Sequence, residues 1–140
     1  MKDISKYISV SYRRTHMFIN ENLKPYGITS GQYMFILGIC ENPGCTQEEL
    51  SQHLLIDKST CAKVIGGLES SGYVRKQCNE TDRREYHLFP TEKALEINPK
   101  IIAAHEQWHR LMTENLTEIE CDIFGRLMEK VMENAVKNCK

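Results

Sequence analysis

Apolar residues recur at helical spacing over most of the chain. From Ile4 to Leu23 they fall on one face of a helix, which Pro25 ends. A second helix is expected after Thr29, which can form a capping box with Gln32. Residues 33–40 are apolar nearly all round, so this second helix should be central and buried. The pattern therefore predicts a mainly α-helical chain.

Two short helices joined by a tight turn are expected next. The first begins at Thr46, which can cap the free amides together with Glu49, three residues later. The second begins after Asp57 in N-cap position and ends at Gly72, which suits the left-handed conformation of a helix C-terminus. Such a pair indicates a helix-turn-helix.

The second of these helices has two unlike faces. The apolar face comprises Cys61, Val64, Ile65 and Leu68, and the small, polar one comprises Ser59, Thr60, Lys63, Gly66 and Gly67. Each glycine costs about 1 kcal/mol relative to alanine in a helix interior. That cost is understandable if the helix must enter a groove closely, and its N-terminus suits a phosphate. The alternative is the solvated face of an ordinary helix.

A β-hairpin is expected after the second helix. Residues 73–78 and 85–89 have strand character, residues 79–84 form a polar turn, and Pro90 stops the second strand. A helix-turn-helix followed by a hairpin is a winged helix. The cations on this wing are Arg75, Lys76, Arg83 and Arg84. Arginines at a hairpin tip can reach a DNA minor groove, where the negative potential attracts them, although a charged, soluble tip is the alternative.

The last third of the chain predicts two long helices. Thr91 caps the first, which should reach Leu116 and be kinked or divided at Pro99. A capping box of Thr117 with Glu120 opens the second. Its apolar stripe includes Ile119, Ile123, Leu127, Val131 and Ala135. A stripe this broad on terminal helices favours a two-fold dimer, with packing inside one subunit as the alternative.

Three motifs resemble the multiple-antibiotic-resistance regulator (MarR) family of bacterial transcription factors over nearly the whole chain. They are Leu68-Glu69-x-x-Gly72-Tyr73-Val74, Asp82-Arg83-Arg84 and Leu88-x-x-Thr91-Glu92-Lys93. The resemblance implies that the second helix reads the major groove and that Arg84 enters the minor groove. Asp82 would hold the Arg84 guanidinium by a bidentate pair. One departure is Phe89-Pro90 before Thr91, which does not touch the expected DNA face.

The leading hypothesis is a homodimeric repressor that binds an inverted-repeat operator and is released by a small-molecule effector. Phosphate contacts would come from Ser30, Gln47, Asp57, Lys58, Ser59, Thr60, and Arg75 or Lys76; base contacts would come from Ser59, Thr60, Ala62 and Lys63. Residues 1–140 would form one domain, with DNA binding in 29–90 and dimerisation through 1–25 and 91–140. The alternative is a winged-helix protein-interaction dimer, which would not need the Asp82-Arg83-Arg84 wing.

The resemblance also implies an effector site. Members of the family often bind small aromatic molecules in a cleft between the dimer helices and the winged helix. Residues with fitting position and chemistry are Tyr12, His16, Tyr33, His105 and Trp108. The alternative is that these are ordinary core and interface residues.

Composition and charge restrict the other classes of function. The 140 residues carry a formal net charge of -1, so a nucleic-acid interface must rest on local placement of charge. There is no signal peptide and no apolar run near 20 residues, so a cytoplasmic protein without membrane contact is expected. No glycine-rich phosphate loop, nucleophile elbow or His-Glu-x-x-His motif occurs, so neither an enzyme nor a cofactor is expected.

Cysteines and histidines leave a thiol- or metal-responsive variant of the regulator open. The six cysteines contain no Cys-x-x-Cys, and free thiols are expected. Cys40 and Cys61 should lie in the core, whereas Cys45, Cys78 and Cys139 should be exposed; Cys61 or Cys78 would carry a thiol switch. His105 and His109 have a metal-ligand spacing. However, Gln32 and Tyr33 stand where zinc-responsive relatives carry ligands, so no metal is expected.

Overall fold

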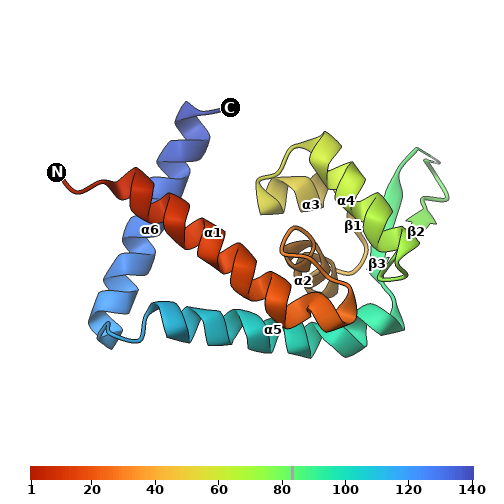
Figure 1. Ribbon diagram of the computed structural model, residues 1–140. Helices are drawn as coiled ribbons and strands as arrows, with labels where there is room; N and C mark the ends of the chain where they lie inside the picture. The colour runs from red at the N-terminus through yellow and green to blue at the C-terminus, as the bar shows by residue number, and fades with distance from the viewer. Residues whose placement is uncertain (83) are drawn as a thin grey trace. The chain divides into compact units, whose positions relative to one another are not determined.

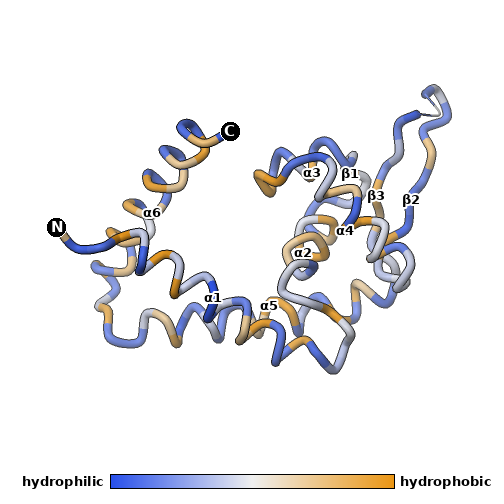
Figure 2. The backbone as a smooth tube through the Cα atoms, turned by 45° about the horizontal axis from the view of Figure 1, so that its top comes forward, coloured by the Kyte–Doolittle hydropathy of each residue, from blue (hydrophilic) through white to orange (hydrophobic). Residues whose placement is uncertain are grey.

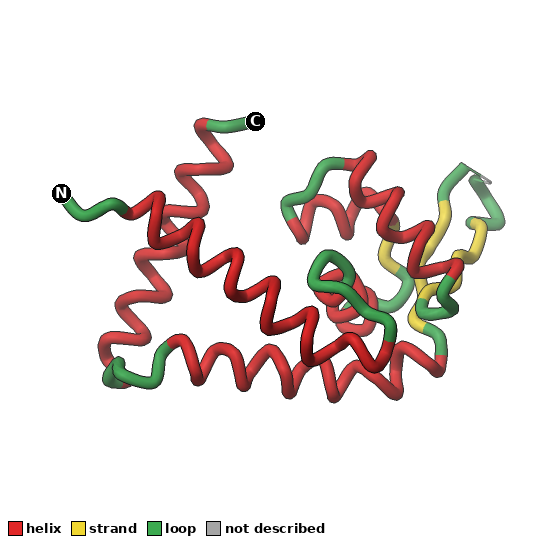
Figure 3. The backbone as a smooth tube through the Cα atoms, in the orientation of Figure 1, coloured by secondary structure: helices red, strands yellow, loops and turns green. Residues whose placement is uncertain are grey.

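The computed structural model describes residues 1–82 and 84–140 and is mainly helical, with one small antiparallel sheet (Figure 3). The elements in chain order are α1 (Ile4–Leu23), η1 (Lys24–Tyr26), α2 (Tyr33–Glu41), β1 (Cys45–Thr46), α3 (Gln47–Leu54), α4 (Lys58–Ser70), β2 (Val74–Cys78), β3 (Tyr86–Pro90), α5 (Glu92–Met112) and α6 (Glu118–Asn138). The predicted winged helix-turn-helix with flanking helices is therefore confirmed.

Helix α1 is long and mostly unburied. Asp3 caps it by accepting the backbone N–H of Lys6 at 3.0 Å. The short η1 helix and Gly27, with φ +68°, then reverse the chain. Only Ile19 and Leu23 of the 20 residues of α1 are buried. Most of the apolar face predicted for this helix is thus open to solvent.

Helix α2 forms the centre of the core. Phe35, Ile36 and Ile39 are all buried, as the apolar pattern predicts. The helix begins at Tyr33, later than expected, because the preceding residues form a turn. Only half of the predicted capping box is present, since Gln32 Oε1 accepts the Thr29 N–H at 3.0 Å.

Helices α3 and α4 form the helix-turn-helix (Figure 1). Thr46 caps α3 by accepting the Glu49 N–H at 3.1 Å. Gly72 follows α4 with φ +82°, which confirms its predicted left-handed conformation. Between the helices, Leu55 has φ +54°, the only positive φ of a non-glycine residue among the described residues. The turn is therefore tight enough to hold a branched side chain in an unfavourable backbone region.

The sheet has three strands in the order β1-β3-β2, where two were predicted. Cys45 pairs with Leu88, and Lys76 pairs with Leu88 from the other side, so β3 is central. Strand β1 is two residues long, too short to produce an alternating pattern. Its pairing buries Cys45, so the predicted exposure of that thiol is wrong.

Helix α5 is continuous through Pro99, so of the two expected effects, a kink or a division, the division is excluded. The helix ends at Met112 rather than Leu116. Contacts divide the chain into two compact units, Met1–Glu106 and Gln107–Lys140. In the second unit, the predicted capping box of Thr117 and Glu120 opens α6. Apolar positions recur along α6 (Figure 2), yet none of its residues is buried. Among the described residues, no helix is both long and apolar enough to cross a membrane.

Candidate nucleic-acid interface

Helix α4 separates its two faces as the sequence predicts. Cys61, Ile65 and Leu68 are fully buried. The side chains predicted to read base edges, Ser59, Thr60, Ala62 and Lys63, are all exposed. Because one cation is the only long side chain among these four, the helix backbone can approach a partner surface closely.

The N-terminus of α4 is organised by Asp57. Its Oδ2 accepts the Thr60 N–H at 2.9 Å and the Ser59 hydroxyl at 2.6 Å. These hydrogen bonds hold the pKa of Asp57 well below its usual range. An ionised carboxylate repels a phosphate, so Asp57 acts as a helix cap rather than as a phosphate contact. Among the residues predicted to contact phosphate at this helix end, Lys58 carries the positive charge. Lys58 Nζ lies 3.2 Å from Glu48 Oε1, with both side chains exposed.

Two other predicted phosphate contacts come from different elements. Gln47 is the first residue of α3 and is half-buried. Ser30 lies in the turn before α2, where Asn20 Oδ1 accepts its N–H at 2.7 Å. The Ser30 hydroxyl lies 2.6 Å from His16 Nδ1. Contacts from α1 therefore fix the position of Ser30.

The wing, defined as residues 73–90, carries its cations in different environments. The Arg75 guanidinium lies 4.7 Å from the centroid of the Phe89 ring and 3.2 Å from Gln77 Oε1. Lys76 Nζ lies 4.0 Å from Glu69 on α4. The Arg84 side chain is 96% exposed. Arg84 is thus more accessible to a partner than Lys76, whose side chain is 31% exposed.

The Asp82 carboxylate contacts the backbone N–H of Arg84 more closely than it contacts the Arg84 guanidinium. Asp82 Oδ1 accepts the Arg84 N–H at 3.0 Å, whereas Arg84 Nε lies 3.8 Å from the same oxygen. This single long contact replaces the bidentate pair that was expected. Arg83, the remaining predicted wing contact, lies outside the described residues.

A groove of about 460 Å³ brings several of the predicted residues together. It is lined by Thr46, Gln47, Glu48, Lys76, Asp82, Arg84, Glu85, Tyr86 and Leu88. The start of α3 and the wing therefore face one hollow. Sequence reasoning missed Glu48, Glu85 and Tyr86, because nothing in the linear pattern indicates that α3 and the wing meet.

Four of the residues predicted to bind an effector lie in two close ring pairs. Tyr12 and His16 have ring centroids 4.2 Å apart, and Tyr33 and His105 have centroids 5.9 Å apart. Burial raises the pKa of Tyr33. Trp108 belongs to the second unit, Gln107–Lys140.

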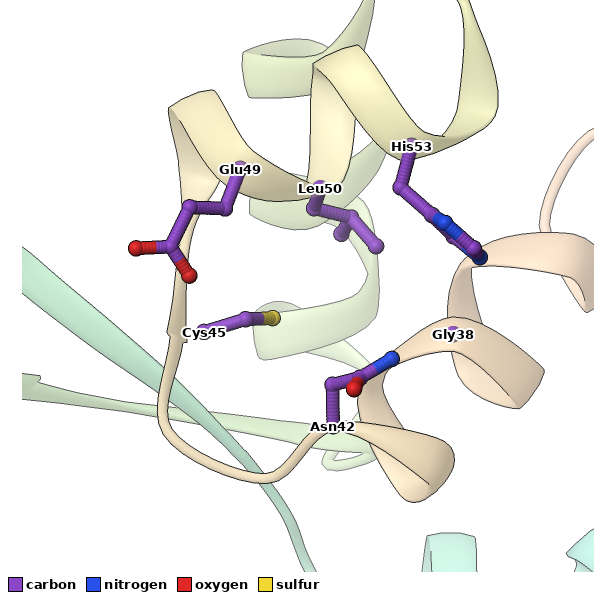
Figure 4. A pocket seen from close by; sticks show the side chains of 6 residues that line it. All are labelled: Gly38, Asn42, Cys45, Glu49, Leu50 and His53. Carbon is purple, nitrogen blue, oxygen red and sulfur yellow. The ribbon is translucent and has the colours of Figure 1, made fainter.

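Another pocket, of about 200 Å³, lies between α2 and α3 (Figure 4). It is lined by Gly38, Asn42, Cys45, Glu49, Leu50 and His53, none of which was predicted to bind an effector. The only sequence signal was the spacing of four between Glu49 and His53, which places both on one side of α3. Helix packing is close here, since a Cβ on Gly38 would lie 2.9 Å from Leu50 Cδ1.

The structure bears on the thiol and metal alternatives. All six cysteines are free. Cys61 is fully buried, and burial raises the pKa of its thiol, which disfavours the reactive thiolate. Cys61 is thus a core residue and not an accessible switch, whereas Cys78 is exposed as predicted. Over residues 1–82 and 84–140, no three His, Cys, Asp or Glu side chains are grouped so as to hold a metal ion.

Comparison with known proteins places these features in a family. The MarR family model matches residues 26–85. The chain is 31% identical over 134 residues to the HTH-type transcriptional regulator YybA of Bacillus subtilis, covering 96% of this chain and 89% of that protein. A MarR transcriptional regulator from Methanosarcina mazei is 35% identical with a TM-score of 0.85, covering 96% of each chain.

A second solved structure includes nucleic acid. It is a Listeria monocytogenes protein described as a MarR family transcriptional regulator, in complex with a 26mer DNA. It is 33% identical, with a TM-score of 0.91, and the match covers 99% of this chain and 92% of that one. The relatives are transcriptional regulators and not enzymes. The chain therefore belongs to the MarR family of transcriptional regulators.

Proposed function

We propose that this protein is a cytoplasmic homodimer that binds an inverted-repeat DNA operator as a repressor and is released by a small-molecule effector. The observation that carries the proposal is the exposed, small and polar face of α4, together with the exposed guanidinium of Arg84 on the wing. A recognition helix needs the first feature, and a minor-groove contact needs the second. The solved Listeria relative in complex with DNA supports this use of the fold.

The contacts divide by the information they carry. Lys58, Arg75 and Lys76 contribute positive charge, and Gln47 and Ser30 contribute neutral donors; all of these position the protein on phosphates. Ala62 and Lys63, with Ser59 and Thr60 beside them, face the base edges in the major groove. Arg84 responds to the width and potential of the minor groove. The net charge of -1 means that these local groups supply the affinity.

Dimerisation is supported by apolar side chains that each unit leaves exposed. In α1 these are Ile4, Tyr7, Ile8, Val10 and Tyr12, and in α6 they include Ile119, Ile123, Phe124, Leu127 and Met132. Unpaired apolar stripes of this extent mark interaction surfaces. Residues 1–25 and 91–140 are therefore proposed as the dimerisation region and residues 29–90 as the DNA-binding region. A two-fold dimer requires operator half-sites about 10 base pairs apart, centre to centre, or a small multiple of that spacing.

The effector is proposed to bind at the Tyr12–His16 pair, with Tyr33 and His105 as a second aromatic pair. Both pairs combine ring surface with a polar atom, which suits a small aromatic molecule. Binding at Tyr12–His16 would act directly on the Ser30 contact.

The decisive experiment is a gel shift with the DNA upstream of the protein's own gene, followed by footprinting. A saturable shift and two protected half-sites related by two-fold symmetry are expected. Lys63→Ala should weaken the shift, and Lys130→Ala on exposed α6 serves as a control that removes the same charge elsewhere. A protein that is dimeric and folded yet binds no DNA better than random sequence would favour the protein-interaction alternative and refute the proposal.

A further inference from the structure

One side chain organises the turn of the wing, residues 79–85. Asn79 Oδ1 accepts the Thr81 N–H at 3.0 Å and the Thr81 hydroxyl at 2.8 Å. Because a backbone N–H can only donate, this amide atom is the oxygen, and the other amide atom is the NH2 group. That NH2 group donates to Glu85 Oε2 at 2.8 Å, and the Asn79 N–H donates to the Glu85 carbonyl at 2.9 Å. Both ends of the Asn79 amide are therefore engaged within the turn.

His87 connects this turn to the body of the winged helix. Its Nδ1 lies 2.7 Å from the carbonyl oxygen of Gly44, and its Nε2 lies 3.5 Å from Asn79 Nδ2. A carbonyl only accepts, so Nδ1 carries the hydrogen. In the neutral ring Nε2 then presents a lone pair, and it faces the NH2 group of Asn79. One tautomer, with the hydrogen on Nδ1, thus satisfies both contacts.

The position of His87 in the sheet makes this link rigid. His87 lies on β3, paired with Thr46 of β1 on one side and Gln77 of β2 on the other. Gly44 directly precedes β1 and donates its N–H to the Leu88 carbonyl at 2.7 Å. The chain of contacts therefore runs from the core-bound sheet, through the imidazole, to the turn that carries Asp82 and Arg84. Apart from the strands themselves, it is a side-chain tether between the wing turn and the body.

The geometry points to a function for this tether: His87, acting through Asn79, is a positioning residue that sets the direction of the Arg84 side chain toward DNA. This inference rests on the proposed DNA-binding function and adds a residue that itself touches no DNA. Loss of the tether leaves the Arg84 charge in place but frees the turn that aims it. The conformational entropy of the wing turn must then be given up when DNA binds, whereas in the parent protein it has already been given up on folding. Affinity is therefore lower.

The test is a double-variant cycle on operator affinity. His87→Ala should weaken binding roughly three- to tenfold, the value of one ordinary hydrogen bond. In the Arg84→Ala background the same change should have no further effect, because the group being positioned is absent. Asn79→Ala should behave in the same way, and serves if His87→Ala does not fold. His53→Ala is the matched control, since it removes an exposed histidine of α3 that makes none of the wing contacts.

An independent measurement concerns the imidazole itself. Long-range 1H–15N NMR spectra of the free protein at neutral pH should show the His87 hydrogen on Nδ1. A hydrogen on Nε2 would overturn the tether. Two affinity results would also overturn the tether, provided that the parent protein binds its operator and needs Arg84 to do so. One is that His87→Ala causes no loss of affinity, and the other is that it causes the same loss with and without Arg84. A parent protein that binds no operator would instead refute the proposed function, and the inference with it.

Discussion

His16 Nδ1 lies 2.6 Å from Ser30 Oγ, so a residue proposed to bind an effector is hydrogen-bonded to one proposed to contact a DNA phosphate. Tyr12 packs on His16, and Asn20 fixes the backbone of Ser30 from the next turn of α1. The contact connects α1 with the turn before α2. If the proposed effector binds α1 here, this contact would link it directly to the proposed DNA contact of Ser30.

This relationship predicts a coupled effect on DNA binding. Ser30→Ala should weaken binding to operator and to random DNA alike, by roughly two- to tenfold, since one hydrogen bond is lost. The dependence of affinity on salt should not change, because serine carries no charge. His16→Ala should have a smaller effect, and the double variant should resemble Ser30→Ala alone. Binding free energies at fixed salt measure this cycle, and strictly additive losses would show that the two residues act separately.

The wing and the recognition helix should respond differently to substitution. Arg84→Ala should weaken binding to operator and random DNA equally and lower the salt slope by about one unit. Lys63→Ala should weaken operator binding more than random DNA, by roughly 1–3 kcal/mol. Asp82→Ala should resemble a milder Arg84→Ala, because the cation remains. Salt-titrated affinities on both DNAs distinguish these cases; unchanged binding by Arg84→Ala at every salt concentration would exclude the wing as a DNA probe.

Substitution of Gly66 should affect protein stability and operator binding in opposite directions. A Cβ added at Gly66 would meet nothing within 4 Å, so Gly66→Ala should raise the free energy of unfolding by about 0.5–1 kcal/mol. The same methyl group lies on the exposed face of α4 and should weaken operator binding. Gly125→Ala is the matched control, since its Cβ would also meet nothing within 4 Å but lies on α6, outside the proposed DNA-binding region. Denaturant unfolding and operator affinity of both variants check this; stronger operator binding by Gly66→Ala would contradict it.

Asp57 should make the stability of the protein depend on pH at the acidic end. Its pKa is lowered in the folded state, first by the Ser59 hydroxyl and then by Thr60. Its contribution is therefore complete above the unfolded pKa of about 4 and is lost as pH falls through the lower, folded pKa. Asp57→Asn keeps an N-cap acceptor without titrating. The melting temperature of the parent should exceed that of this variant near neutral pH, and the gap should narrow below about pH 4. A constant gap would refute this assignment.

The exposed stripe of α6 should control assembly. Ile123 and Leu127 are each about half exposed, and a charge at either position in a dimer core would be unpaired. Ile123→Asp and Leu127→Asp should therefore shift the protein from dimer to monomer or aggregate in analytical ultracentrifugation. Glu129→Lys, an exposed charge change on the same helix, should leave the dimer intact. A dimer that survives both aspartates would place the interface elsewhere.

Local sequence signals predicted the elements well where one residue type has a single physical role. Asp57 and Thr117 accept the N–H groups predicted for helix caps, and Gly72 takes the predicted positive φ. The alternation of apolar and polar residues on α4 also assigned its faces correctly, because a helix has a fixed period.

What the sequence could not predict depends on contacts between distant segments. Strand β1 exists only because β3 lies beside Cys45, and the groove between α3 and the wing exists only because the sheet brings them together. Pro99 was expected to kink or divide α5, and it does not divide it, since tertiary packing of Ile97 and Ile101 on either side holds the helix in one piece. The tautomer of His87 likewise requires knowledge of the Gly44 carbonyl, more than 40 positions away.

The order of the strands has a consequence for solubility. Strand β3 is paired on both sides, so the outer edges of this sheet belong to β1, which has two residues, and to the longer β2. An open edge can recruit the same strand of another copy and start aggregation. Strand β2 carries Arg75 and Lys76, and two such copies brought edge to edge would place like charges against each other. The cations proposed to hold DNA phosphates would thus keep the DNA-free protein from polymerising through its wing.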